Sequence, residues 1–146
     1  MSLFNTPTKY DIKDAESTLS HMRSLVRNLS YCDSVSQYYS KIEEIGITFD
    51  KFYAYEKRGV KFTSNSKKVR QEVIQELESV ERSFIDRAYQ RCERDSLKYK
   101  TKRGVLNCYE RFFAEFMYYV DRIYPSNYKY LLSLEDHVSE YFNSQP

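Results

Sequence analysis

The sequence predicts an all-α fold: an antiparallel helical bundle of four long helices followed by a shorter C-terminal helix. Apolar residues recur at alternating three- and four-residue steps along most of the chain, which is the pattern of amphipathic helices. No segment alternates apolar and polar residues at two-residue steps, so no strand is predicted. The 146 residues include only three glycines, too few for a turn-rich β-sandwich or barrel. Residues 1–146 are interpreted as a single helical-bundle domain with a flexible N-terminal segment at residues 1–8.

The first helix is predicted to begin near residue 9. Thr8 and Asp11 have the spacing of a capping box directly after Pro7, in which each side chain accepts a hydrogen bond from the other residue's backbone N–H. An apolar stripe then continues for about five helical turns. Its members are Ile12, Ala15, Leu19, Met22, Val26 and Leu29.

The second helix is predicted from Asp33, its expected N-cap, to the glycine at position 59. Lys57 and Arg58 precede Gly59, and cations in the last turn followed by glycine are typical of a helix end. Gly46 lies inside the stripe and weakens the prediction of an uninterrupted helix. The apolar members are Val35, Tyr38, Ile42, Ile45, Phe49 and Phe52.

Three more helices are predicted beyond this point. The third follows the polar cluster at residues 63–66 and runs to about Tyr99, the fourth follows Gly104, and Pro125 ends it. Residues 126–127 then start the fifth. The third helix begins with an apolar stripe of Val73, Leu77, Val80 and Phe84. The fourth has Val105, Tyr109, Phe112, Phe116, Tyr119 and Ile123, and the fifth has Tyr128, Leu131, Leu132, Val138, Tyr141 and Phe142.

The stripe of the third helix changes from apolar to cationic residues halfway along. Continued beyond Phe84 at the same steps, it reaches only cations, namely Arg87, Arg91, Arg94 and Lys98. The connection that follows adds Lys100, Lys102 and Arg103. Residues 87–103 therefore contain seven basic residues and two acidic ones. Their local charge is +5, in a chain whose formal net charge is +2.

A helix seam does not bury four unpaired cations, because removing each from water costs several kcal/mol. Three arrangements remain open. The helix bends or rolls near Ile85 so that the cations reach solvent, the end of the helix projects as a basic prong, or the cations line a cleft and pair with carboxylates or an anionic ligand. Solvated cations that compensate the helix dipole need no function at all.

The functional hypothesis is a binding surface for a macromolecule, formed by the seven cations together with the interleaved Tyr89 and Tyr99. Arginine donates paired hydrogen bonds to carboxylates and phosphates, and tyrosine supplies contact area. The first interpretation is a protein partner with an acidic surface. The alternative is RNA or DNA, because cations bind phosphates and exposed aromatic rings stack on bases. No known nucleic-acid-binding motif supports the alternative.

Catalysis is not expected. The chain has two histidines, and neither His21 nor His137 has the glutamate three residues before it that bundle metal sites use. Cys92 and Cys108 could approach each other across a helical hairpin, but two thiols alone do not predict zinc, and they are interpreted as buried, inert groups. We therefore expect no enzymatic activity, no metal and no cofactor.

The 15 tyrosines exceed what a small helical core needs. Tyr38–Tyr39 and Tyr118–Tyr119 are adjacent pairs, and neighbours on a helix are expected to face different directions, so some rings should be exposed or lie at an interface. A homo-oligomer would cover them. The absence of a signal-peptide pattern, of a long apolar run and of an even cysteine count predicts a cytoplasmic protein without membrane contact.

Overall fold

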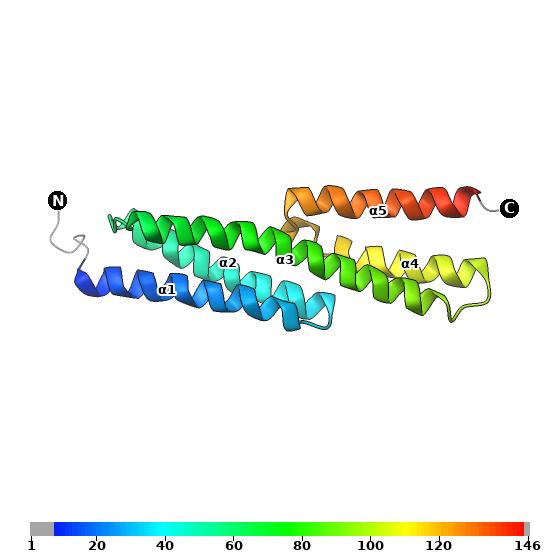
Figure 1. The fold of residues 1–146 in the computed structure, drawn as a ribbon, viewed down its shortest axis with the longest axis horizontal. Helices are drawn as coiled ribbons and strands as arrows, with labels where there is room; N and C mark the ends of the chain where they lie inside the picture. Colours follow the sequence, from blue (N-terminus) through cyan, green and yellow to red (C-terminus); the bar gives the residue numbers. More distant parts are fainter. Residues whose placement is uncertain (1–7, 145–146) are drawn as a thin grey trace. The chain divides into compact units, whose positions relative to one another are not determined.

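The computed structural model describes residues 8–144, and this part of the chain consists of helices joined by short connections, without a strand (Figure 1). The all-α prediction is confirmed. The α-helices are α1 (Lys9–Asn28), α2 (Val35–Lys57), α3 (Ser64–Ser96), α4 (Lys102–Met117) and α5 (Pro125–Ser144). Two short 3₁₀ helices, η2 (Leu29–Tyr31) and η3 (Val120–Arg122), lie between them.

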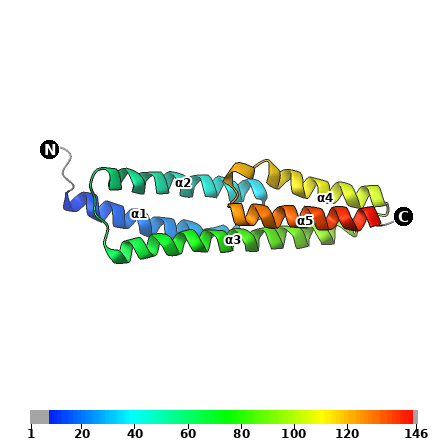
Figure 2. The same ribbon diagram turned by 90° about the horizontal axis from the view of Figure 1, so that it is seen from above.

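The chain divides into two compact units, whose boundary falls within α3 between Leu77 and Glu78. The N-terminal unit contains α1, α2 and the first part of α3, and the C-terminal unit contains the rest of α3 with α4 and α5. Within each unit, successive helices run antiparallel (Figures 1 and 2). The interpretation of the whole chain as one domain stays a prediction. Residues 1–7 of the expected flexible segment lie outside the described part.

The helix ends of the N-terminal unit follow the sequence signals closely. Thr8 caps α1, and its hydroxyl oxygen accepts the Asp11 N–H at 3.2 Å while Asp11 accepts the Thr8 N–H at 2.9 Å. The N-cap of α2 is Ser34 rather than Asp33, since the Ser34 hydroxyl accepts the Gln37 N–H at 3.1 Å. Gly59 follows α2 with a φ of 90°, a conformation that favours glycine.

The core of the N-terminal unit corrects the expectation about adjacent tyrosines. Tyr38 and Tyr39 are both fully buried, and their rings meet edge to face with centroids 5.0 Å apart. Adjacent residues are separated by only about 100° around a helix, so an apolar face of that width buries both. This pair therefore leaves no tyrosine surface for a partner to cover.

Helix ends differ from prediction around Pro125. The fourth helix was expected to reach it, but α4 ends at Met117, and Pro125 is the first residue of α5. Proline is favourable there because the first turn of a helix has no partner for its N–H groups, and the proline ring already has a helical φ. The C-terminal helix therefore begins one residue earlier than the predicted start at residues 126–127. With 20 residues it is longer than α4 with 16, so the prediction of a shorter C-terminal helix was wrong.

The start of α5 is fixed by two glutamates of α3 in the C-terminal unit. The fully buried Glu81 accepts hydrogen bonds at Oε1 from the Tyr124 N–H at 3.2 Å and from the Asn127 side-chain amide at 2.9 Å. Asn127 also donates to the Glu78 carbonyl oxygen at 2.9 Å, and the Ser126 hydroxyl donates to the Glu78 carboxylate at 2.7 Å. A carboxylate at a helix N-terminus also has a favourable interaction with the helix dipole.

Replacing Glu81 should destabilise the C-terminal unit through the donors it leaves behind. We expect Glu81→Ala to lower the free energy of unfolding by about 2–4 kcal/mol, because the buried Asn127 amide and the partly buried Tyr124 N–H lose their acceptor. Glu81→Gln keeps an acceptor oxygen and should cost clearly less. Urea titrations followed by far-UV circular dichroism measure both. Equal losses for the two variants would contradict the assigned role.

Candidate partner-binding surface and aromatic pocket

All seven predicted cations are exposed, and we call them the basic surface. Its members are Arg87, Arg91 and Arg94 on α3, Lys98 and Lys100 in the connection, and Lys102 and Arg103 at the start of α4. Opposite these cations, the buried line of α3 passes through Ile85, Cys92 and Ser96. Of the three arrangements considered, the structure has the one in which the cations reach solvent.

Helix dipoles account for only part of the basic surface. Arg94 lies in the last turn of α3, where a cation interacts favourably with the helix dipole. Lys102 and Arg103 lie in the first turn of α4, where the same dipole opposes a positive charge. The dipole of α4 therefore does not account for these two cations. Within the basic surface, Lys98 forms an ion pair, with its Nζ 3.4 Å from the Asp95 carboxylate.

The two predicted tyrosines have different surroundings. Tyr99 is 42% exposed in the connection between the cations, and its hydroxyl oxygen accepts a hydrogen bond from Arg111 at 2.9 Å. Tyr89 is half-buried and packs against Tyr109 and Phe112, with centroids 5.9 and 5.6 Å apart. Two residues correspond to about 200° around a helix, so Tyr89 points away from Arg87. The structure joins Tyr99 to the basic surface and places Tyr89 elsewhere.

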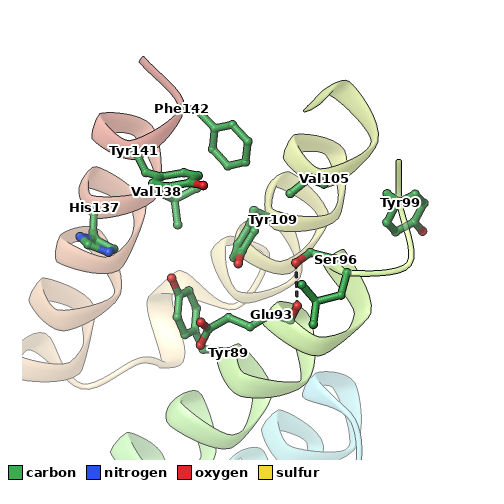
Figure 3. Close-up of a pocket in the computed structure, with 11 residues that line it drawn as sticks. Tyr89, Glu93, Ser96, Tyr99, Val105, Tyr109, His137, Val138, Tyr141 and Phe142 are labelled. Carbon is green, nitrogen blue, oxygen red and sulfur yellow. Dashed lines mark hydrogen bonds between the residues drawn. The ribbon is translucent and has the colours of Figure 1, made fainter. Parts of the chain in front are cut away.

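Tyr89 instead lines a pocket of about 460 Å³ in the C-terminal unit, which we call the aromatic pocket (Figure 3). The end of α3, the first half of α4 and the second half of α5 form its walls. The lining residues are Tyr89, Glu93, Ser96, Leu97, Tyr99, Val105, Tyr109, His137, Val138, Tyr141 and Phe142. Sequence reasoning placed several of them on separate helix stripes and did not bring them together.

The pocket contains a carboxylate beside neutral tyrosines. Burial, followed by the charges of Tyr109 and Glu93, raises the pKa of Tyr89 to about 12. Burial also raises the pKa of Tyr109, and Glu93 adds to that shift while a hydrogen bond with Ser96 opposes it. Both phenols therefore stay protonated near neutral pH. Figure 3 shows the Glu93 side chain extending from α3 toward Tyr89.

The thiols of Cys92 on α3 and Cys108 on α4 lie close together in the interior. The Sγ atoms of Cys92 and Cys108 are 3.9 Å apart, and both residues are buried. Burial, together with Cys108, raises the pKa of Cys92 to about 12, so this thiol stays protonated and a poor nucleophile. Within residues 8–144, no group of three or more His, Cys, Asp or Glu side chains could hold a metal ion.

The adjacent pair Tyr118–Tyr119 follows α4. Tyr118 is 77% exposed and Tyr119 is half-buried, and their rings meet edge to face with centroids 4.9 Å apart. Tyr141 on α5 is 57% exposed and Leu97 is 83% exposed. Unlike the pair in α2, these side chains leave aromatic and apolar area on the surface of the C-terminal unit.

Comparisons with protein-family models, with curated proteins and with solved structures give no match. For residues 8–144, no helix has both the length and the apolar character that a bilayer crossing requires.

The raised pKa values predict a loss of stability at alkaline pH. When unfolded, Tyr89, Tyr124 and Cys92 ionise near their ordinary values of 10.0, 10.0 and 9.0, whereas in the folded unit they resist ionisation up to about pH 12. The free energy of unfolding should be constant below pH 9 with respect to these groups and fall as the pH rises from about 9 to about 12.

Urea unfolding at several alkaline pH values measures this slope. Tyr124→Phe removes one of the three ionising groups and should make the decline shallower, whereas Ser139→Ala, at an exposed position, should leave it unchanged. An identical slope in the Tyr124 variant and the parent chain would contradict the assignment.

Proposed function

We propose that this protein is a non-enzymatic helical interaction module with a regulatory role, and that its basic surface binds a macromolecular partner with an acidic surface. The observation that supports the proposal best is the exposure of all seven cations within residues 87–103. Two of them, Lys102 and Arg103, lie in the first turn of α4, where the helix dipole opposes a positive charge.

The mechanism of binding follows from the side chains. Arg87, Arg91 and Arg94 lie along one face of α3, so their guanidinium groups can donate paired hydrogen bonds to carboxylates of the partner. The lysines add a positive potential that steers an acidic partner and raises the association rate. Tyr99 supplies an aromatic ring between the two groups of cations.

Charge reversal should abolish this binding without unfolding the chain. The variant Arg87→Glu/Arg91→Glu should bind a fluorescent polyglutamate peptide at least about ten-fold more weakly, because it loses two attractive contacts and gains two repulsive ones. Fluorescence anisotropy measures the affinity, and circular dichroism checks the helix content. Lys67→Glu/Lys68→Glu, two exposed cations at the other end of α3, is the matched control.

Unchanged affinity in the arginine variant, or equal weakening in the lysine control, would refute a local basic binding surface. Unfolding of the arginine variant would show that these side chains are structural.

Nucleic acid is the second candidate, favoured by the exposed ring of Tyr99 beside the cations. The same anisotropy titration with a single-stranded oligonucleotide separates it from the first. If phosphates are the ligand, the logarithm of the affinity should fall steeply with the logarithm of the salt concentration, and Arg91→Ala should reduce that slope by about one. No binding at low salt would remove this candidate.

Self-association is a further part of the proposal. Tyr118, which follows α4, is 77% exposed on the C-terminal unit, and a second copy of the chain could cover it. Sedimentation velocity should show a species larger than the monomer whose fraction rises with protein concentration, and Tyr118→Ser should lower that fraction. A monomer at every concentration would contradict self-association.

A further inference from the structure

We propose that the aromatic pocket is a binding site for a small organic cation, in which an alkylated ammonium group carries an apolar body. The site is distinct from the basic surface and goes beyond the function proposed above. It is formed by α3, α4 and α5 of the C-terminal unit, and its tyrosine rings surround a space that one carboxylate faces (Figure 3).

The walls of the pocket are mainly aromatic. Tyr109 lies between Tyr89 and Phe142, with ring centroids 5.9 and 6.1 Å away, and Tyr141 lies 5.3 Å from Phe142. Aromatic rings attract a cation through their electron-rich faces, and alkylated ammonium groups are the ions that rings bind best, because such ions are weakly hydrated. Val105 and Val138 complete an apolar lining for the body of the ligand.

The charged group in the pocket favours a positively charged ligand. Its lining includes no lysine or arginine, and Glu93 is its carboxylate. Tyr89 and Tyr109 remain neutral because burial raises the pKa of both. An anion would be repelled by Glu93, whereas a cation gains both the carboxylate and the rings. The three arginines of the basic surface that belong to α3 leave that helix on the other side from Tyr89.

The size of the pocket favours a molecule over a bare ion. About 460 Å³ falls within the range of sites that bind small organic ligands. His137, Leu97 and Tyr141 are exposed and also line the pocket, so a ligand can enter from solvent. The exposed apolar rim formed by Leu97 and Tyr141 gives the body of the ligand a surface to cover.

The experiment uses the full chain and two steps. In the first, benzyltrimethylammonium is titrated into isotopically labelled protein, and NMR shift changes report affinity and location. We expect the changes to centre on Glu93, Tyr109 and Val138. In the second, choline is compared with 3,3-dimethylbutan-1-ol, which has the same shape without the charge. Choline should bind more tightly, because only its charge interacts with Glu93 and the ring faces.

Variants test the two recognition elements separately. Glu93→Gln should weaken the binding of benzyltrimethylammonium by about five-fold, the effect of one opposite charge at about 4 Å in water. Glu140→Gln, at an exposed glutamate of α5 outside the pocket, should have no effect. Tyr109→Phe keeps the ring and should retain binding, and Tyr109→Leu should lose it. If Tyr109→Leu does not fold, Tyr141→Leu at an exposed position replaces it.

Equal affinity for choline and its neutral analogue would overturn the proposal, as would shift changes outside the pocket or a Glu93→Gln variant that binds as the parent does. These outcomes are independent of the basic surface. Loss of polyglutamate binding in Arg87→Glu/Arg91→Glu, with binding of the organic cation intact, would show two separate sites. Unchanged polyglutamate binding in that variant would remove only the proposal for the basic surface.

Discussion

The C-terminal unit depends on one buried carboxylate. Glu81 has no exposed surface, and burying an ionised group is costly unless hydrogen bonds and favourable dipoles replace its water. The Tyr124 N–H, the Asn127 amide and the N-terminus of α5 supply that replacement. Because the start of α5 is held there, its second half brings Val138, Tyr141 and Phe142 to the aromatic pocket. The pocket is therefore a consequence of a polar contact several turns away.

Periodicity predicted the helices because each helix has a continuous apolar face, and capping signals such as Thr8 with Asp11 are local in the sequence. The role of Glu81 has a weak local signal: a glutamate stands four residues from both Leu77 and Ile85, in line with apolar positions. Its partners come from a segment more than forty residues later. The aromatic pocket requires three helices to meet, and no spacing within one helix encodes that meeting.

The second part of α3 shows how one helix carries two surfaces of opposite character. Arg87, Arg91 and Arg94 recur at helical steps and face solvent, whereas Cys92 and Ser96 recur on the side that packs. The sequence predicted this division, because the positions of one helical stripe change from apolar residues to cations after Phe84. Tyr89 lies two residues from both Arg87 and Arg91, so the sequence also allowed it as part of the binding surface, and the structure instead packs it against Tyr109 and Phe112. Angle around the helix, rather than distance along the chain, decides which residues share a surface.

The connection between α3 and α4 adds a constraint on how the cations act. The Thr101 hydroxyl accepts the Gly104 N–H at 3.0 Å, and a Cβ at Gly104 would lie 3.1 Å from both Thr101 Oγ1 and the Tyr99 side chain. A larger residue would push these groups apart, so glycine allows the connection to fold tightly against the start of α4. Lys102 and Arg103 are consequently held on a capped helix and not on a free loop. A partner of the kind proposed above would find their backbone already ordered, which lowers the entropic cost of association.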